Sequence, residues 1–136
     1  KQMATDIFVF DALIDNTDRR RENPNLLWRG DRLAIIDHEM AFGFLLAIPQ
    51  IRNPWKLMEQ PYLKNHIFFH ALRGTEVDLN RMAGVIEAVD QKFWDDLETV
   101  IPHEWKSEIM LRIRGHIESM QQNLQEFIDN IGRILQ

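Results

Sequence analysis

The C-terminal part of the chain repeats apolar residues at helical spacing, and no other feature restricts its possible folds as much. The apolar positions recur at steps of three and four, which places them on one face of a helix. They predict a single final helix of about 30 residues, roughly 45 Å long. The positions are Ile109, Ile113, Ile117, Met120, Leu124, Phe127, Ile131 and Leu135.

The preceding segments are mostly typical of helices as well. A dense apolar run over residues 7–14 follows a possible helix start at Thr5-Asp6, and further helices are expected after Asp78 and Asp90. Two short apolar runs on either side of residues 29–32 instead predict a β-hairpin with a four-residue turn containing glycine. We therefore expect a mainly α fold with one small hairpin at about residues 26–36, in a single domain over residues 1–136.

Charge and composition narrow the class of protein. The net charge of −5 gives no general signal for binding nucleic acid. The chain contains no cysteine, which excludes disulfides and thiolate chemistry and agrees with a reducing compartment. No apolar run approaches the roughly 20 residues of a membrane-spanning helix. A cytoplasmic protein without a transmembrane segment is expected.

Three oxygen-bearing side chains are placed so that they can converge. Asp18 lies in a polar loop after the first predicted helix, and Asn23 follows it by five positions. The predicted hairpin then returns the chain to the same neighbourhood and ends at Asp37. Phosphoryl transfer needs such a set, because one carboxylate orients the attacking hydroxyl while an amide oxygen and a second carboxylate hold Mg²⁺.

The order of these residues resembles known kinase families. Phosphoinositide 3-/4-kinases have Asp-Arg-His-x-x-Asn, a hairpin and then Ile-Asp-Phe-Gly. The chain is still more similar to HipA-like kinases, in which Asn-x-Asp is followed by Asn five residues after the Asp. The matching positions are residues 13–18, Asn23, Leu26-Leu27 and Ile36-Asp37.

The resemblance implies a role for each residue. Asp18 would be the catalytic Asp, Asn23 and Asp37 would bind the metal and its nucleotide, and Asn16 would shape the loop. The implied fold is the helical C-lobe of a protein-kinase-like enzyme that uses Mg²⁺ and ATP to phosphorylate a hydroxyl of a protein Ser/Thr or a lipid. Only 17 residues precede Asp18, so we expect the N-terminal nucleotide lobe to be missing and the isolated chain to be inactive.

The chain departs from these patterns next to its polar residues. Arg20 replaces the His of the lipid kinases, His38-Glu39 replace Phe-Gly, and Glu22 stands where HipA-like kinases favour Lys. One of the three arginines at 19–21 could supply the missing phosphate-contacting charge, and the sequence does not indicate which. A hydrogen bond from His38 to Asp37 is a further hypothesis.

Two alternatives remain. The chain could be a pseudokinase or a helical interaction module, with a homodimer formed through the final helix. His66 and His70 have a spacing that can bind zinc, but the lack of a third ligand favours packed or surface histidines.

Overall fold

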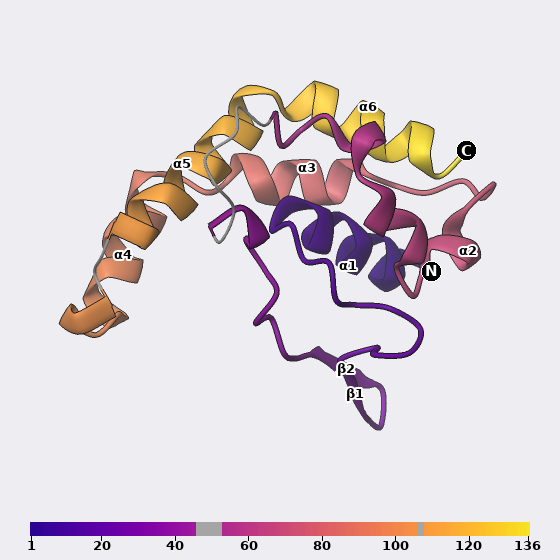
Figure 1. Cartoon of the computed structure of the whole chain (residues 1–136), viewed down its shortest axis with the longest axis horizontal. Coiled ribbons are helices and arrows are strands. Elements are labelled where there is room, and N and C mark those ends of the chain that lie inside the picture. The colour runs from indigo at the N-terminus through magenta and orange to yellow at the C-terminus, as the bar shows by residue number, and fades with distance from the viewer. Residues whose placement is uncertain (46–52, 106–107) are drawn as a thin grey trace.

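The computed structural model describes residues 1–45, 53–105 and 108–136. It is mainly helical with one two-stranded hairpin, which confirms the predicted fold class (Figure 1). The elements are α1 (Gln2–Leu13), β1 (Leu26–Arg29), β2 (Arg32–Ile35), α2 (Phe69–Leu72), α3 (Asn80–Glu87), α4 (Gln91–Val100), α5 (Glu108–Gln122) and α6 (Leu124–Ile134), with short 3₁₀ turns at Gly43–Leu45, Leu57–Glu59, Pro61–Asn65 and His103–Trp105. Among the described helices, none combines the length and apolar character needed to cross a bilayer.

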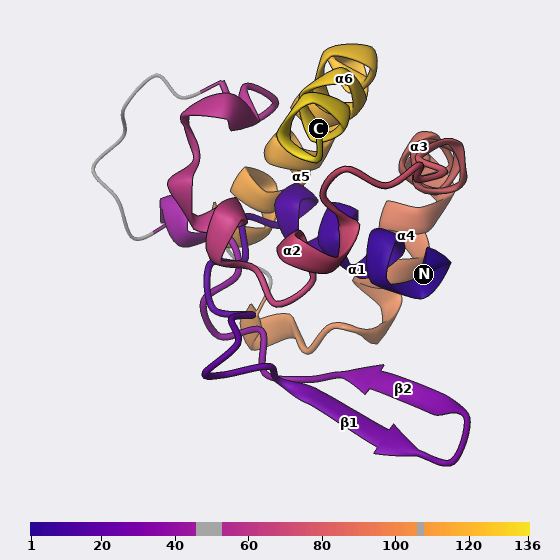
Figure 2. The same cartoon turned by 90° about the vertical axis from the view of Figure 1, so that its right-hand side faces the viewer.

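Helix α1 lies at the centre of the helical body. Figure 2 shows it surrounded by α2, α3, α5 and α6. Its side chains are buried nearly all round, and Phe8 and Val9 have no exposed surface. The helix begins at Gln2, earlier than the Thr5-Asp6 start expected from capping residues. Thr5 instead lies inside the helix, where its hydroxyl donates to the carbonyl of Lys1 at 3.4 Å.

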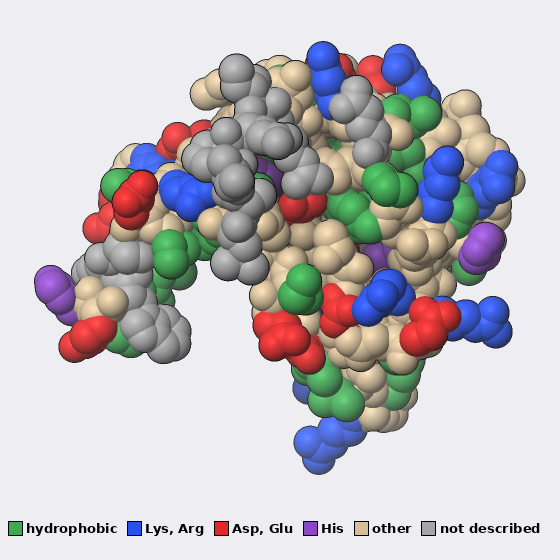
Figure 3. All heavy atoms as spheres, in the orientation of Figure 1, with side chains coloured by type: hydrophobic (Ala, Val, Ile, Leu, Met, Phe, Trp, Pro, Cys, Tyr) green, Lys and Arg blue, Asp and Glu red, His purple; other side chains and the backbone are tan. Residues whose placement is uncertain are grey.

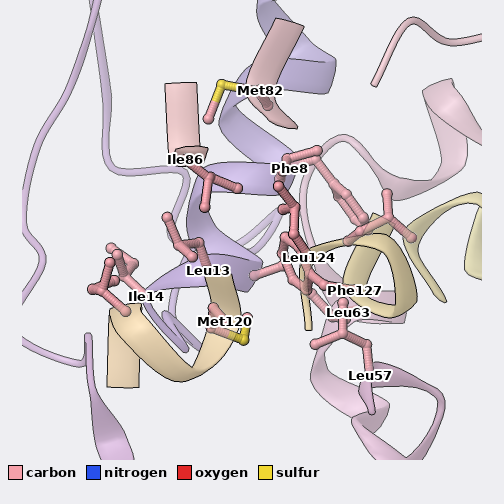
Figure 4. Packing of buried hydrophobic residues seen from close by; sticks show 14 of the residues in the cluster. Phe8, Leu13, Ile14, Leu57, Leu63, Met82, Ile86, Met120, Leu124 and Phe127 are labelled. Atoms are coloured by element: carbon pink, nitrogen blue, oxygen red, sulfur yellow. The ribbon is translucent and has the colours of Figure 1, made fainter. Parts of the chain in front are cut away.

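The hydrophobic core joins α1 to the C-terminal helices. Phe8 and Leu13 of α1 meet Met120 and Leu124, while Leu57 and Leu63 close the other side (Figure 4). The core residues that are completely buried are Phe8, Val9, Leu63, Met120, Phe127 and Ile131. Burying a large apolar side chain contributes about 1.5–3 kcal/mol to stability. The cluster therefore holds α1 firmly in place, and the loop that follows α1 starts from a fixed position.

The predicted single final helix is wrong, because the helix is interrupted at Asn123. Its backbone leaves helical geometry with φ −118° and ψ 27°, and its Nδ2 donates to the carbonyl of Ser119 at 2.9 Å. An asparagine side chain competes for backbone groups in this way, which favours a break. The resulting turn lets the apolar faces of α5 and α6 bend over α1 (Figure 1).

The hairpin has the predicted location but a shorter connection. Leu26 pairs with Ile35 and Arg29 with Arg32, so only Gly30 and Asp31 join the strands. Gly30 has φ +63°, a conformation that a residue without Cβ adopts freely. The hairpin projects from the helical body, and Trp28 is 67% exposed (Figure 2).

Helices α4 and α5 form an arm that extends from the helical body (Figure 1). Asp90 caps α4 as predicted, because its carboxylate accepts the backbone N–H of Phe93 at 2.9 Å. Asp78 does not cap α3, which begins after Leu79, although its carboxylate accepts the backbone N–H of Asn80 at 3.0 Å. Arg112 of α5 donates to the carbonyls of Phe44 and Leu45, so α5 contacts the segment that follows the hairpin.

Candidate functional site

The loop after α1 brings Asp18 and Asn23 into direct contact. Nδ2 of Asn23 donates to Oδ2 of Asp18 at 2.5 Å, and the Asp18 side chain is 15% exposed. Asn16 supports the loop from the buried side. Its Oδ1 accepts the backbone N–H of Asp18 at 3.3 Å, and its Nδ2 donates to Asp11 at 2.8 Å. Asn16 therefore makes loop-shaping contacts of the kind that the resemblance implied.

The hairpin returns Asp37 to the same loop. The backbone N–H of Ile36 donates to the carbonyl of Asn25 at 3.0 Å, which closes the hairpin at its base. Nδ2 of Asn25 lies 3.4 Å from Oδ2 of Asp18 and 3.4 Å from the carbonyl oxygen of Asp37. Asp37 is exposed, and among the described residues no hydrogen bond joins its carboxylate to Asp18 or Asn23. Asn25 thus connects Asp18 to the backbone carbonyl of Asp37 and not to its carboxylate.

Unusual backbone conformations gather around these residues. Every non-glycine residue with positive φ in the described part of the chain lies between positions 15 and 42. They are Asp15 (52°), Asn25 (48°), Asp37 (53°) and Phe42 (56°). Asp and Asn tolerate this region better than most residues, and such conformations cluster at functional sites. Two of the four flank the hairpin, so they set the direction in which Asp37 leaves it.

The donor atoms are of the kind that Mg²⁺ prefers. Asn23 uses its nitrogen for Asp18, which leaves its Oδ1 outside that bond, and Asp37 offers an exposed carboxylate. Within the described ranges, no group of three or more His, Asp or Glu side chains is arranged to hold a metal ion. A cation here would therefore complete its shell with water and phosphate oxygens, as Mg²⁺ commonly does.

Arg19 is buried beneath the site and connects its parts. Its Nε donates to Oδ2 of Asp11 at 2.5 Å, and both side chains have 0% exposure. Nη1 donates to the carbonyls of Pro24 at 3.3 Å and Asn25 at 2.7 Å. Nη2 contacts Nε2 of His38 at 3.1 Å. Because a guanidinium has no acceptor, His38 accepts through Nε2 and carries its proton on Nδ1.

Asp11 receives a full set of donors inside the core. Besides Arg19, Nε2 of His66 lies 3.0 Å from Oδ2 of Asp11. The other ring nitrogen of His66 accepts the backbone N–H of Phe68 at 3.2 Å, so His66 is a neutral ring with its proton on Nε2. This arrangement links α1 to the segment before α2, 55 positions along the chain.

The pKa of Asp11 reflects two opposing effects. Burial raises the pKa of this carboxyl, because a charge is unfavourable away from water. Hydrogen bonds from His66, Arg19 and Asn16, together with the charge of Arg19, outweigh burial and hold the pKa of Asp11 below its ordinary value of 3.8. Asp11 is therefore ionised at neutral pH and compensates the buried Arg19.

The segment after Asp37 is fixed to α5. The backbone N–H of Phe42 donates to the carbonyl of Ile14 at 2.6 Å. Arg112 of α5 donates to the carbonyls of Phe44 and Leu45, each at 3.2 Å. We call this contact the Arg112 clamp. The Arg112 clamp holds the segment that follows the hairpin against α5. The bond from Phe42 to Ile14 joins the same segment to the end of α1.

Sequence reasoning missed the buried support of the site. Asp11 and His66 were not singled out as a pair, and His38 was considered as a partner of Asp37, whereas it accepts from Arg19. The available signal was Asp11 itself, a carboxylate inside the apolar run at residues 7–14. His66 precedes α2 and is buried, while His70 lies on α2 and is exposed, so the two do not form the helical zinc pair considered above.

A family model described as HipA-like kinase matches residues 1–131. No curated protein and no solved structure matches the chain. The matched range contains α1, the loop with Asp18 and Asn23, the hairpin and Asp37.

Proposed function

Because the chain belongs to the HipA-like kinase family, we propose that it carries the acid–base and metal-binding residues of an ATP-dependent phosphotransferase. Asp18 orients the attacking hydroxyl and accepts its proton. The amide oxygen of Asn23 and the carboxylate of Asp37 hold Mg²⁺. When bound, the metal neutralises the charge on the phosphate oxygens.

The hydrogen bond from Asn23 to Asp18 is the observation that supports this proposal most. In this bond Nδ2 of Asn23 lies 2.5 Å from Oδ2 of Asp18, so the amide oxygen of Asn23 points away from that carboxylate. The proposed base and one proposed metal ligand therefore come from the same loop. Asn25 then links this loop to Asp37. Positioning and charge stabilisation supply most of the catalysis in phosphoryl transfer, so a preorganised loop suits this reaction.

The acceptor is a hydroxyl, and family analogy favours a protein Ser or Thr over a lipid. The reaction also requires a cationic group and a flexible loop that grip the ATP phosphates, which we propose are supplied by a separate lobe. On this proposal, residues 1–136 alone bind the metal but transfer phosphate poorly.

Ligand-induced thermal stabilisation of the natural full-length protein tests the proposal. At 100 times its Kd, Mg·ATP should stabilise the folded state by about 2.7 kcal/mol. Asp37→Asn should remove most of this gain, and Asn is chosen because it tolerates the φ of +53° at this position. Asp31→Asn is the matched control, because it removes the same charge from the exposed hairpin turn. An equal gain in both variants would refute the role of Asp37.

An interaction module is the second candidate, and the α4–α5 arm favours it. Val100 and Leu111 are 74% and 71% exposed, and a groove of about 350 Å³ is lined by Trp94, Ile101 and Met110 among others. Figure 3 shows hydrophobic side chains along the inner side of this arm. A second copy of the chain would cover this surface. A dimer in sedimentation experiments that Leu111→Glu dissociates, with no response to Mg·ATP, would favour this candidate.

A further inference from the structure

The groove on the arm is lined by apolar side chains from both of its helices. Trp94, Leu97 and Ile101 line it from α4 and its C-terminal end, at steps of three and four residues. Met110 and Leu111 line it from α5. Trp94 is buried, whereas Leu111 is exposed. Apolar residues at this spacing form the kind of surface on which a further amphipathic helix packs.

The groove also carries uncompensated negative charge. Arg114 lies in the lining, but its donors are already engaged: Nε donates to Oε1 of Glu118 at 2.7 Å, and Nη2 donates to Oε1 of Gln91 at 2.7 Å. The carboxylates of Glu98 and Glu108 line the same groove. Both residues are exposed, and neither forms an ion pair with another residue of the described chain. A ligand of this groove therefore meets carboxylates beside apolar surface.

The negative charge of the chain is concentrated in this arm. Residues 87–108 contain seven Asp or Glu side chains and two Lys, so their net charge of −5 equals that of the whole chain. The rest of the chain is therefore neutral overall. Figure 3 shows acidic side chains on the outer side of the arm. Such a segregated charge attracts a cationic partner and repels nucleic acid and anionic membranes.

From the groove and its charge we propose that the arm is a docking surface for a basic amphipathic helix of a partner protein. The apolar face of that helix covers Leu97, Ile101 and Leu111. Its Lys or Arg side chains, which flank the apolar face, pair with Glu98 and Glu108. A helix that lies in a groove is recognised through anchors three to four residues apart, and the lining from α4 has the same spacing. The inference holds whether or not the chain transfers phosphate.

The charge of the arm favours such a helix over a second copy of the chain. A second copy could cover the apolar area, but two arms joined through the same groove would bring two segments of charge −5 together. Like charges across an interface oppose association, whereas a basic helix is attracted by the same carboxylates. The partner helix is therefore the occupant that fits both the apolar and the charged part of the groove.

Binding of two synthetic peptides to the 136-residue chain tests the proposal by titration calorimetry. Both peptides contain the same numbers of Leu and Lys over about 15 residues, a length at which a helix can form. In the first, Leu recurs at steps of three and four; in the second, the order is shuffled so that no apolar face forms. The first should bind about tenfold more tightly or better, because the charge is the same in both. Equal affinities, or no binding of the first peptide, would overturn the proposal.

Leu111→Ala tests the apolar part of the groove. Because Leu111 is exposed in the free chain, its truncation should leave the fold intact and weaken binding of the first peptide by about tenfold. Val85→Ala is the matched control, since Val85 is an exposed apolar residue on α3 and lies outside the groove. It should change the affinity by about twofold or less. A loss of the same size in both variants would show that the groove is not the binding site.

The double variant Glu98→Gln and Glu108→Gln tests the charged part. It should weaken binding of the first peptide by about tenfold at low ionic strength, and by much less in about 1 M salt, because salt screens exposed charges. Glu76→Gln combined with Glu126→Gln is the control, since it removes two exposed carboxylates outside the arm. An effect in the arm variant no larger than in this control would contradict the proposed pairing.

Sedimentation identifies the competing occupant. The unmodified chain should be monomeric at the concentrations of the titrations, and it should form a one-to-one complex with the first peptide. A dimer that Leu111→Ala dissociates and that the peptide does not displace would assign the groove to a second copy of the chain, and the proposal would then be wrong.

Discussion

Nε of Arg19 lies 2.5 Å from Oδ2 of Asp11, and neither side chain is exposed to solvent. This ion pair joins the central helix to the loop that carries Asp18 and Asn23. The same guanidinium holds the base of the hairpin and His38. The geometry of the candidate site is therefore determined by a charge pair in the core, below the residues that would meet a substrate.

Breaking this pair should be strongly destabilising. Arg19→Met leaves Asp11 charged and buried, so we expect a loss of about 3–5 kcal/mol in the free energy of unfolding, measured by urea denaturation. Asp11→Leu combined with Arg19→Met removes both charges and should recover part of the loss. Arg21→Ala serves as the control, with an expected change within about 0.5 kcal/mol. A loss in Arg19→Met no larger than in this control would contradict the structural role of the pair.

Stability should also fall in acid through Asp11. Its pKa in the folded chain lies below the ordinary value of 3.8, so its contribution is present above that value and disappears as the pH falls through the folded pKa. The free energy of unfolding, followed from pH 6 to the acid limit of folding, should show this loss below about pH 4. Asp11→Asn should give a shallower dependence over the same interval, and an identical slope would argue against a lowered pKa.

Asn25 offers a test of the link between the loop after α1 and Asp37 at the end of the hairpin. Its side chain reaches both Asp18 and the carbonyl of Asp37, and its φ is +48°. Asn25→Gly keeps the backbone conformation but removes the bridging amide, so we expect Mg²⁺ affinity to fall by about tenfold with little change in global stability. Asn53→Gly, an exposed substitution of the same kind, should leave Mg²⁺ affinity unchanged. Calorimetric titration measures both.

The hairpin turn should respond locally to substitution. Gly30 has φ +63° and open space around the position of a Cβ, so the cost of Gly30→Ala comes from the backbone alone, about 1 kcal/mol. Amide hydrogen exchange should become faster in β1 and β2 and remain unchanged in α1. Gly30→Asn should have a smaller effect, because Asn tolerates positive φ. Faster exchange throughout α1 would show that the hairpin and the core unfold together.

The parts of the fold that the sequence predicted depend on local chemistry. The hairpin follows from two short apolar runs around a glycine, and Asp90 caps α4 through a backbone group three residues further on. The contact between Asp18 and Asn23 belongs to the same class, since both lie in one short loop. In these cases the partners are close in sequence, so a local pattern was sufficient to predict them.

The remaining features depend on distant parts of the chain or on one side chain. Asp11 and His66 are 55 positions apart, and nothing in either neighbourhood indicates the other. The break at Asn123 leaves the apolar spacing undisturbed, because Met120, Leu124 and Phe127 still face the core after the turn. Periodicity records which residues are buried, and it does not record where the helix axis changes direction.

The Arg112 clamp has a consequence for protein engineering. Residues 11–38 contain every side chain assigned a chemical role, so they look like a cassette that could be moved to another scaffold. The carbonyls that position the exit of this cassette are nevertheless held by a helix about 70 residues further along the chain. A transplant limited to the short segment would keep its chemistry and lose its alignment. The smallest unit worth grafting therefore extends through α5.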